Sequence, residues 1–336
     1  KRLNLFFIGF YFLIGFTPYL NAIDKIATQF LFLSIYNIVV FTFINFSYKF
    51  YKDSFHYLIK FKYFFSFLGL VILSALSYFY SENGIESLVQ TSRYLNYFFA
   101  LVNVFLLSKS DFEYNIKHLS YIIVGVLTIE VIWIYKNLIE NIDLMSSYRQ
   151  QSLRAFTGNI NITAFAVLYK TPFLFYILYL SKNRYLKFFS ALIIVSTFFI
   201  IFNLGSRAAN YSSLILVFFA VVFFFKSKKY NLLFFTVFLF LSSIFINRLV
   251  YRGNDSYDYI ERSLKINNAS SNSRIGFYTD ALNSISEKPI LGIGSGNWKI
   301  KSIELDRLSI IDYTIPYHVH NDFLEVTAEL GILGFL

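Results

Sequence analysis

The chain has 336 residues, of which 56% are hydrophobic and only 15% are charged, and its formal net charge is +10. This balance excludes an ordinary soluble domain and is typical of a polytopic membrane protein. The absence of cysteine excludes disulfides, thiol nucleophiles and cysteine-held metal sites. The lysines cluster in short loops between apolar runs, so membrane topology explains the positive charge better than a nucleic-acid partner does.

Nine apolar stretches each approach the roughly 20 residues that a helix needs to cross a bilayer. They are Leu3–Leu20, Ile26–Phe46, Phe61–Tyr80, Leu88–Leu107, His118–Ile139, Asn161–Leu180, Leu186–Leu204, Ala208–Phe225 and Leu232–Leu249. A tenth begins at Phe323 and stops with the chain at Leu336. The chain opens without Met, and we expect the native protein to continue past Leu336. The predicted fold is all-α with about ten transmembrane helices, the last one truncated.

The spans divide the chain into a predicted membrane bundle at residues 1–249, a long polar loop at 250–322, and the start of a further span at 323–336. Lys and Arg concentrate in alternate loops, which places the N-terminus in the cytoplasm by the positive-inside rule. The loop 250–322 then faces outward, together with Arg93, Arg154 and Arg207. We interpret the outward side as a bacterial periplasm or cell exterior, which makes this a multi-pass protein of the inner membrane.

Arg207 lies in a hairpin between two predicted spans and has no acidic residue near it in sequence. One interpretation is an anchor that reaches the lipid headgroups, as a lone Arg at a helix end commonly does. The other is a phosphate clamp, because a guanidinium presents a planar fork that binds phosphate oxygens through two hydrogen bonds. Both interpretations stay open from the sequence.

Arg274 follows Ser271 and Ser273, either of which we expect to cap a short amphipathic helix. Its apolar face is predicted to contain Ile275, Tyr278, Leu282 and Ile285, and the helix is expected to lie at the membrane interface with Arg274 in its first turn.

The glycine run at Gly292, Gly294 and Gly296 is similar to a phosphate-binding loop only in composition. It follows a predicted helix and Pro289, and no Lys-Ser or Lys-Thr pair comes after it, so the dinucleotide and P-loop patterns fail their context. A turn is favoured over a nucleotide site, although close approach of the backbone to a substrate stays open.

The segment His318-Val-His320-Asn321 stands at the mouth of the last predicted span. Two imidazoles are one ligand short of a catalytic zinc site, so Asp322 or Glu325 would have to complete it, and we favour no metal. His320, with Asn321 beside it, suits a general base or a hydrogen-bonding group near neutral pH.

Taken together, these motifs resemble the O-antigen ligase and O-antigen polymerase superfamily. The resemblance rests on the outward Ser-Arg207, on Ser-x-Ser-Arg274 with the glycine run behind it, and on His318-x-His320-Asn321 followed by Glu325. Arg154 and the residues after it are also similar to the segment before the family's central helices. The resemblance covers roughly residues 154–336.

The resemblance implies a GT-C-like membrane glycosyltransferase with a long periplasmic loop that contains short amphipathic helices. Such an enzyme takes a glycan from a polyprenyl (undecaprenyl) diphosphate carrier and transfers it to a hydroxyl on lipid A core, another glycan or a protein. The family works with inversion, without metal or other cofactor. The implied catalytic residues are Arg207 and Arg274 on the diphosphate and His320 on the acceptor. Substrate-binding groups are expected at Arg154, His318, Asn321, Gly294 and Gly296, with Arg149 as a competitor for Arg154.

Two alternatives stay open. A repeat-unit polymerase of the same superfamily has the same motifs. A lipid-linked glycan transporter would use intramembrane charges and a broken helix, and Lys170, just before Thr171-Pro172, and Glu130 are such charges. The simpler account is an ion pair between Lys170 and Glu130 on neighbouring helices. We favour the enzyme because the polar residues concentrate at the outward side of the predicted spans.

Overall fold

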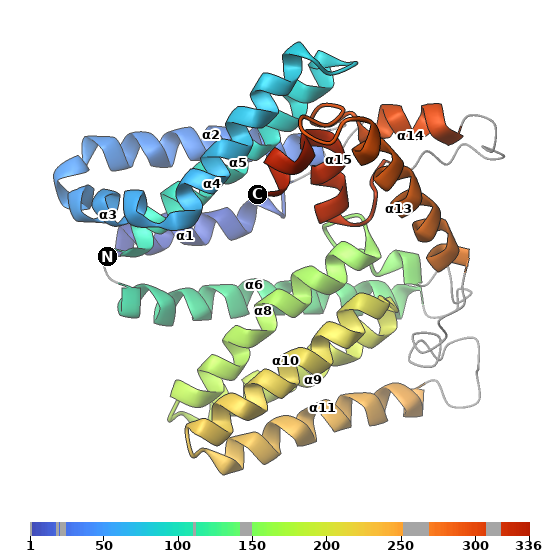
Figure 1. Cartoon of the computed structure of the whole chain (residues 1–336). Helices are drawn as coiled ribbons and strands as arrows, with labels where there is room; N and C mark the ends of the chain where they lie inside the picture. The colour runs from blue at the N-terminus through green and yellow to red at the C-terminus, as the bar shows by residue number, and fades with distance from the viewer. Residues whose placement is uncertain are drawn as a thin grey trace. The chain divides into compact units, whose positions relative to one another are not determined.

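The computed structural model describes residues 2–17, 20, 25–109, 112–141, 150–250, 269–306 and 317–336, and every regular element in these ranges is helical (Figure 1). The elements of the N-terminal half are α1 (Arg2–Ile14), α2 (Lys25–Phe46), α3 (Tyr48–Lys60), α4 (Lys62–Leu76), the 3₁₀ turn η1 (Ser77–Phe79), α5 (Gly84–Lys109) and α6 (Phe112–Glu140). The others are α8 (Ile160–Leu180), α9 (Arg184–Leu204), α10 (Arg207–Lys226), α11 (Tyr230–Val250), α13 (Ala269–Glu287), α14 (Trp298–Asp306) and α15 (Asp322–Phe335).

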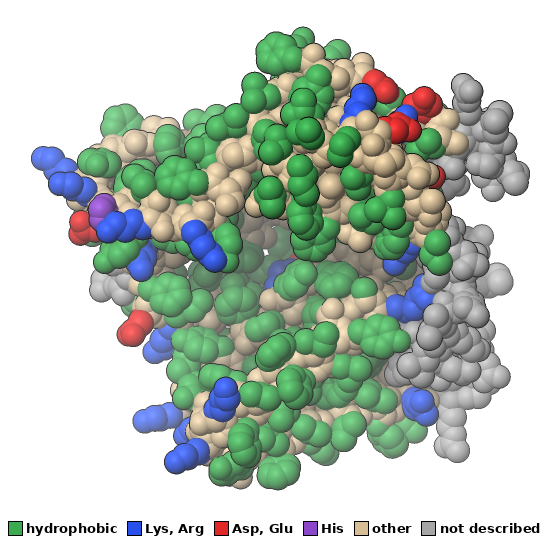
Figure 2. Space-filling view, in the orientation of Figure 1, with side chains coloured by type: hydrophobic (Ala, Val, Ile, Leu, Met, Phe, Trp, Pro, Cys, Tyr) green, Lys and Arg blue, Asp and Glu red, His purple; other side chains and the backbone are tan. Residues whose placement is uncertain are grey.

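Seven of the described helices are long and apolar enough to cross a membrane, namely α2, α4 with η1, α6, α8, α9, α10 and α11. A polytopic, all-helical membrane protein is thus confirmed for the described part of the chain. Large apolar side chains cover much of the visible surface, as expected for helices that face lipid (Figure 2). The remaining predicted spans stay predictions. The described helix α1 has only 13 residues, and α5 carries Glu86, Gln90 and Arg93 in its first half.

The chain divides into two compact units. The first comprises residues Lys1–Gln29 and Asp111–Lys265, and the second comprises Phe30–Ser110 and Ile266–Leu336. The predicted boundaries at residues 249 and 322 describe membrane topology, and they differ from the boundaries of these compact units. The predicted division into membrane bundle, polar loop and further span therefore stays a prediction.

The first unit is built around α8 and α9, which pack on each other and on α6, α10 and α11. Its core is a large cluster of Leu, Ile, Val and Phe side chains in which Leu174, Ile194 and Phe198 are fully buried. Asn159 caps α8 by accepting hydrogen bonds from the backbone N–H groups of the second and third helical residues. Apolar packing and satisfied helix ends therefore account for this unit.

The predicted intramembrane ion pair is confirmed in the first unit. Lys170 Nζ lies 2.9 Å from both carboxylate oxygens of Glu130 and also donates to the Ala166 carbonyl oxygen at 2.9 Å. Both side chains are largely buried. Each charge therefore satisfies the other.

The second unit joins α4, η1 and α5 to α13, α14 and α15. Its C-terminal part has a small core of Ala281, Ile293, Trp298, Val319 and Ala328. The residues that follow Pro289 run beside a break in α15 at Gly331, where φ is 65° and ψ is −165°. Backbone hydrogen bonds across this contact join Ile293 N–H to the Ala328 carbonyl, Gly294 N–H to the Glu329 carbonyl and Ile332 N–H to the Pro289 carbonyl. These bonds satisfy backbone groups that the broken helix leaves unpaired.

Candidate functional site

The glycine run of the second unit binds the turn between α4 and α5. Ser295 is fully buried there, and its backbone N–H donates to Ser77 Oγ at 3.0 Å. Ser87 Oγ donates to the Ser295 carbonyl at 2.9 Å, and Ser74 Oγ donates to Ser295 Oγ at 2.9 Å. The residues in these contacts are more than 200 positions apart in sequence. These hydrogen bonds therefore hold the glycine loop in one position at the end of the α4–α5 hairpin.

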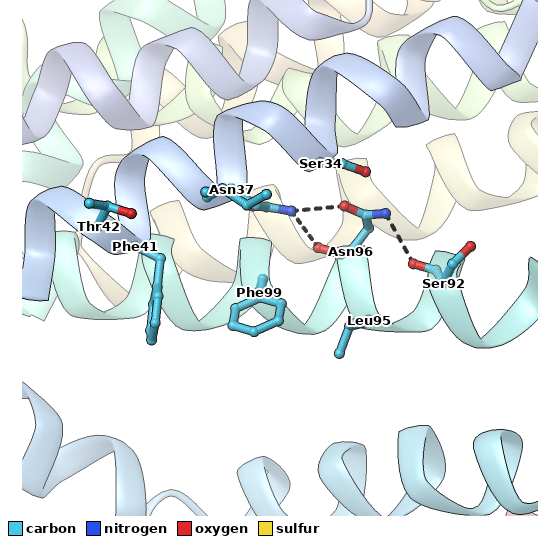
Figure 3. A pocket seen from close by; sticks show the side chains of 9 residues that line it. Ser34, Asn37, Phe41, Thr42, Ser92, Leu95, Asn96 and Phe99 are labelled. Atoms are coloured by element: carbon cyan, nitrogen blue, oxygen red, sulfur yellow. Dashed lines mark hydrogen bonds between the residues drawn. The ribbon is translucent and has the colours of Figure 1, made fainter. Parts of the chain in front are cut away.

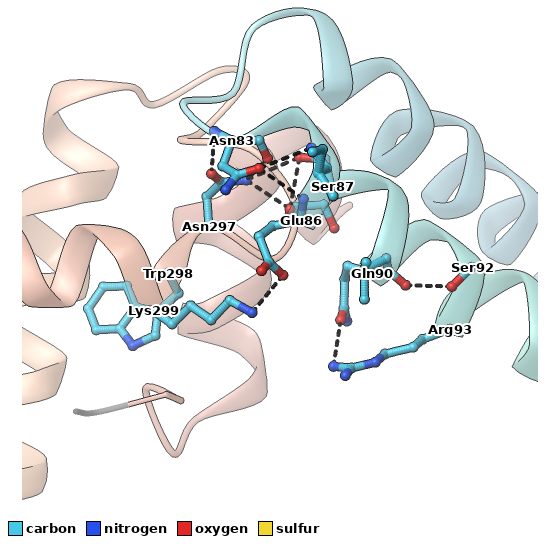
Figure 4. Close-up of polar contacts among 12 residues, drawn as sticks. Asn83, Glu86, Ser87, Gln90, Ser92, Arg93, Asn297, Trp298 and Lys299 are labelled. Carbon is cyan, nitrogen blue, oxygen red and sulfur yellow. Dashed lines mark hydrogen bonds and ion pairs between the residues drawn. The ribbon is translucent and has the colours of Figure 1, made fainter. Parts of the chain in front are cut away.

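A second set of polar contacts joins the residues after the glycine loop to the same hairpin (Figure 4). The Asn83 N–H donates to Asn297 Oδ1 at 2.9 Å, and Asn297 Nδ2 donates to Ser87 Oγ at 3.1 Å. Lys299 Nζ pairs with Glu86 Oε2 at 2.6 Å. By the predicted topology the loop and the α4–α5 turn are both outward, and the contacts agree with that assignment.

The glycines of this loop are required by its backbone. Gly292, Gly294 and Gly296 have φ values of +68°, +104° and +73°, a region that side chains with a Cβ rarely adopt. An added Cβ would meet, in the same order, the Glu329 backbone, the Ser81 side chain and the Glu86 carbonyl oxygen. Packing against protein thus explains these glycines, and binding of substrate by Gly294 and Gly296 stays a prediction.

Glu329 is a buried carboxylate under the same loop. The Trp298 N–H donates to Glu329 Oε1 at 3.1 Å, and the Gly296 backbone makes a second hydrogen bond with the carboxylate. Since Trp298 begins α14, the carboxylate sits at the positive end of that helix. Glu329 therefore fixes the end of the glycine loop to α15.

The histidine segment, residues 318–321, is bound to the first turns of α15 through the Glu325 carboxylate and the Asn321 side chain. His318 Nδ1 lies 2.9 Å from Glu325 Oε1, and the Val319 N–H donates to Glu325 Oε2 at 2.9 Å. Asn321 is the N-cap of α15 and accepts from the Phe323 and Leu324 N–H groups. The hydrogen bond with Glu325 raises the pKa of His318 above its ordinary value. His318 and Asn321 thus hold the segment in place, and their predicted contact with substrate stays a prediction.

His320 has a different environment from His318. Its φ is +60°, which is uncommon for a residue with a Cβ, and its ring is exposed beside Phe277 with 6.0 Å between the ring centroids. Tyr278 Oη lies 3.4 Å from the His320 carbonyl oxygen. Partial burial, the positive charge of Arg274 and the nearby His318 lower the pKa of His320. The imidazole is therefore neutral near pH 7 and has an electron pair available to accept a proton.

Arg274 lies on α13 one turn before Tyr278, and its side chain is exposed. The structure thus brings Arg274 and His320 to the same region of the second unit, although the rest of α13, the glycine run and α14 lie between them in the sequence. The roles implied for Arg274 on the diphosphate and for His320 on the acceptor require these two residues to lie close together.

The predicted start of this helix is wrong. α13 begins at Ala269, so Ser271 and Ser273 lie inside it and Arg274 is in its second turn. Ser and Asn are only slightly weaker helix formers than most residues, so the Ser-Asn-Ser run does not stop the helix from starting earlier. Of the predicted apolar face, Tyr278 and Ile285 pack on the core, whereas Ile275 and Leu282 are exposed.

Arg154 and Arg207 belong to the first unit. Arg207 is the first residue of α10, and the N-cap residue Ser206 separates it from the left-handed Gly205 that ends α9. Gln150 Nε2 donates to the Leu204 carbonyl at 2.7 Å, which places the segment of Arg154 beside this hairpin. Arg154 Nε donates to the Gln151 carbonyl at 2.9 Å, and its competitor Arg149 lies outside the described residues. The implied joint role of Arg207, Arg274 and His320 in one reaction stays a prediction.

Arg93 was not among the predicted site residues. It extends from α5 over the Phe30 ring, with 5.7 Å from Cζ to the ring centroid, and its Nη1 lies 3.5 Å from Gln90 Oε1. Its positive charge opposes the rise in the pKa of His318, which places it near the histidine segment. The available signal was an Arg within a predicted span, near its outward end.

No group of three or more His, Asp or Glu side chains among the described residues is arranged to hold a metal ion. The residues that do gather in the second unit are cations, neutral imidazole and buried carboxylate. This set can bind an anion and accept a proton.

Residues 191–336 match a family model described as O-antigen ligase. The matched segment is less than half of the chain, and over this segment the chain is similar to the O-antigen ligase family. The predicted resemblance is thus confirmed, and the match contains Arg207, Arg274 and the histidine segment. A Rickettsia conorii protein named provisionally as a polysaccharide ligase is 42% identical over 60 residues, which are 16% of this chain and 14% of that protein. No solved structure matches the chain.

Proposed function

We propose that this protein is a membrane glycosyltransferase of the O-antigen ligase type. It takes a glycan from a polyprenyl diphosphate carrier at the outward face of a bacterial inner membrane. It transfers the glycan to an acceptor hydroxyl on lipid A core, another glycan or a protein. The observation that carries the proposal is the exposed His320 ring, which lies beside Phe277 on α13, the helix that also carries Arg274, inside the part of the chain that matches the family model.

The proposed reaction forms a bond between the acceptor oxygen and the anomeric carbon and breaks the bond from that carbon to the diphosphate. The acceptor proton goes to His320, and the leaving electron pair stays on the polyprenyl diphosphate. Arg274 and Arg207 stabilise the negative charge that develops there, as fixed cations do at an anionic leaving group. Attack on the face opposite the diphosphate inverts the sugar.

The surface polysaccharide of a deletion strain tests this function. Loss of long glycan on lipid A core, with normal polymer on the carrier, supports a ligase. Loss of chain length itself identifies a polymerase of the same superfamily. Normal surface glycan in a strain whose carrier-linked polymer is also normal contradicts both, and repeats trapped on the cytoplasmic side would favour transport.

A further inference from the structure

A pocket of about 350 Å³ lies between α2 and α5 in the second unit (Figure 3). α2 is one of the membrane-length helices, so the pocket lies along a predicted span. Its walls include Ser34, Asn37 and Phe41 from α2 and Leu95, Asn96 and Phe99 from α5.

The amides in the wall are hydrogen-bonded to protein. Asn37 Nδ2 donates to the Asn96 carbonyl at 2.9 Å and to Asn96 Oδ1 at 3.3 Å, and Asn96 Nδ2 donates to the Ser92 carbonyl at 3.0 Å. Asn103 Nδ2 donates to the Asn37 carbonyl at 3.1 Å. Because these donors bond to the protein, the pocket presents mainly hydrocarbon and aromatic surface. Such a surface favours an apolar chain.

A cation stands at one end of this pocket. Arg93 lies over Phe30, one helical turn before Ser34 on α2, and is adjacent to Ser92 on α5. Among the described residues no carboxylate forms an ion pair with Arg93. An apolar pocket with a guanidinium at its end complements a lipid that has an anionic phosphate headgroup.

The position of Arg93 distinguishes between lipids. The positive charge of Arg93 acts to lower the pKa of His318, and His318 is two residues from His320 in the chain. A headgroup bound by Arg93 therefore lies near the proposed reacting group, where an ordinary phospholipid would obstruct the donor.

We propose that the α2–α5 pocket binds the first isoprene units of the donor's polyprenyl chain and that Arg93 binds its diphosphate. This inference rests on the proposed function, since it assigns the lipid part of the donor to a site. Arg93 is then a third cation for the diphosphate, beside the two arginines predicted from the sequence.

Two variants on α5 test the pocket. Leu95→Trp fills it, whereas the matched control Leu101→Trp places the same ring about 120° further around the helix, at a similarly exposed Leu that does not line the pocket. Binding of undecaprenyl diphosphate without glycan is measured by native mass spectrometry on the full-length protein in phosphatidylcholine nanodiscs. We expect Leu95→Trp to weaken binding about tenfold, the equivalent of about two methylene groups left unburied, and Leu101→Trp to leave it unchanged.

A headgroup variant completes the test. Arg93→Gln should weaken undecaprenyl diphosphate about tenfold, with little effect on undecaprenol, because the alcohol lacks the phosphates that the guanidinium binds. Arg93→Lys should be intermediate.

Three outcomes overturn the inference: equal effects of Leu95→Trp and Leu101→Trp, equal effects of Arg93→Gln on the diphosphate and the alcohol, or competition by phosphatidylglycerol as strong as that by undecaprenyl diphosphate. Binding is measured without sugar transfer. Failure of the proposed function would therefore appear as absent transfer with the differential binding intact.

Discussion

In the first unit, 50% and 56% of the most apolar stretches of α8 and α9 are buried, whereas only 17% is buried in α2 and α4, which lie mainly in the second unit. The first unit is held by a continuous cluster of apolar side chains. The second joins segments more than 200 residues apart through serine hydroxyls, asparagine amides and glycine backbone. The predicted proton acceptor and one predicted arginine belong to this second unit.

The difference shows that the large apolar core belongs to the first unit, whereas the polar groups proposed to react belong mainly to the second. A helix bundle tolerates many apolar substitutions of similar volume. A loop whose backbone is fixed by hydrogen bonds and left-handed glycines tolerates few, but it holds polar groups in defined positions, as a reactive site requires. The following experiments probe each side of this contrast.

The largest expected effect is all-or-none labelling. The chain has no cysteine, so Glu82→Cys in the α4–α5 turn and Lys182→Cys between α8 and α9 are single reactive sites. An impermeant maleimide added to intact cells should label residue 82 at once and residue 182 only after permeabilisation. The reverse pattern would place the second unit's polar loop in the cytoplasm and remove the periplasmic site.

His320→Ala should reduce glycan transfer by about 10²–10⁴-fold, the usual contribution of a positioned general base. His118→Ala on α6 of the first unit is the matched control and should transfer normally. Because the pKa of His320 is lowered from 6.5, the wild-type rate should stay high to below pH 6.5 and then fall as the imidazole becomes protonated. Full activity of His320→Ala would exclude His320 as the base.

Gly294→Ala should destabilise the second unit by about 3 kcal/mol, since it combines a strained φ with overlap of Cβ and Ser81. Gly276→Ala in α13 has open space around the added Cβ and should be neutral or stabilising by about 0.5–1 kcal/mol. Thermal unfolding in detergent measures both. Equal melting temperatures for the two variants would mean that the glycine loop is not fixed as described.

Lys170→Met should destabilise the first unit by about 2 kcal/mol, because Glu130 loses its partner in an apolar environment. The double variant Lys170→Met with Glu130→Leu should recover most of this loss, since a buried ion pair is often replaceable by apolar residues. Sugar transfer by the folded double variant is expected to be normal. A double variant that folds well but loses transfer would give the pair a functional role and revive the transporter.

The smallest effect concerns His318 and Glu325. The pKa of His318 is raised in the folded state, so its contribution to stability is complete below the ordinary value of 6.5 and is lost as the pH rises through the folded pKa. The side chain is exposed, which limits the contribution to about 0.5 kcal/mol. The difference in unfolding free energy between wild type and His318→Gln should therefore be larger at pH 5.5 than at pH 8.5. A difference that grows with pH would contradict the ion pair.

Hydropathy alone predicted the seven long apolar helices of the described residues, because the free energy of placing apolar residues in a bilayer is a local property of about 20 consecutive residues. The Lys170–Glu130 pair was predictable for a similar reason, since two isolated charges inside apolar spans must find each other. The spacing of Arg207, Arg274 and His320 was also enough to indicate the family.

Only the tertiary structure placed Arg93 over the Phe30 ring, bound the glycine loop to the α4–α5 turn and broke α15 at Gly331. These features depend on segments far apart in the chain, and a period of apolar residues carries no information about such partners. The start of α13 was missed because capping preferences are weak compared with the packing that decides where a helix begins. Local composition therefore determined which segments enter the membrane, and long-range backbone contacts decided which polar groups meet.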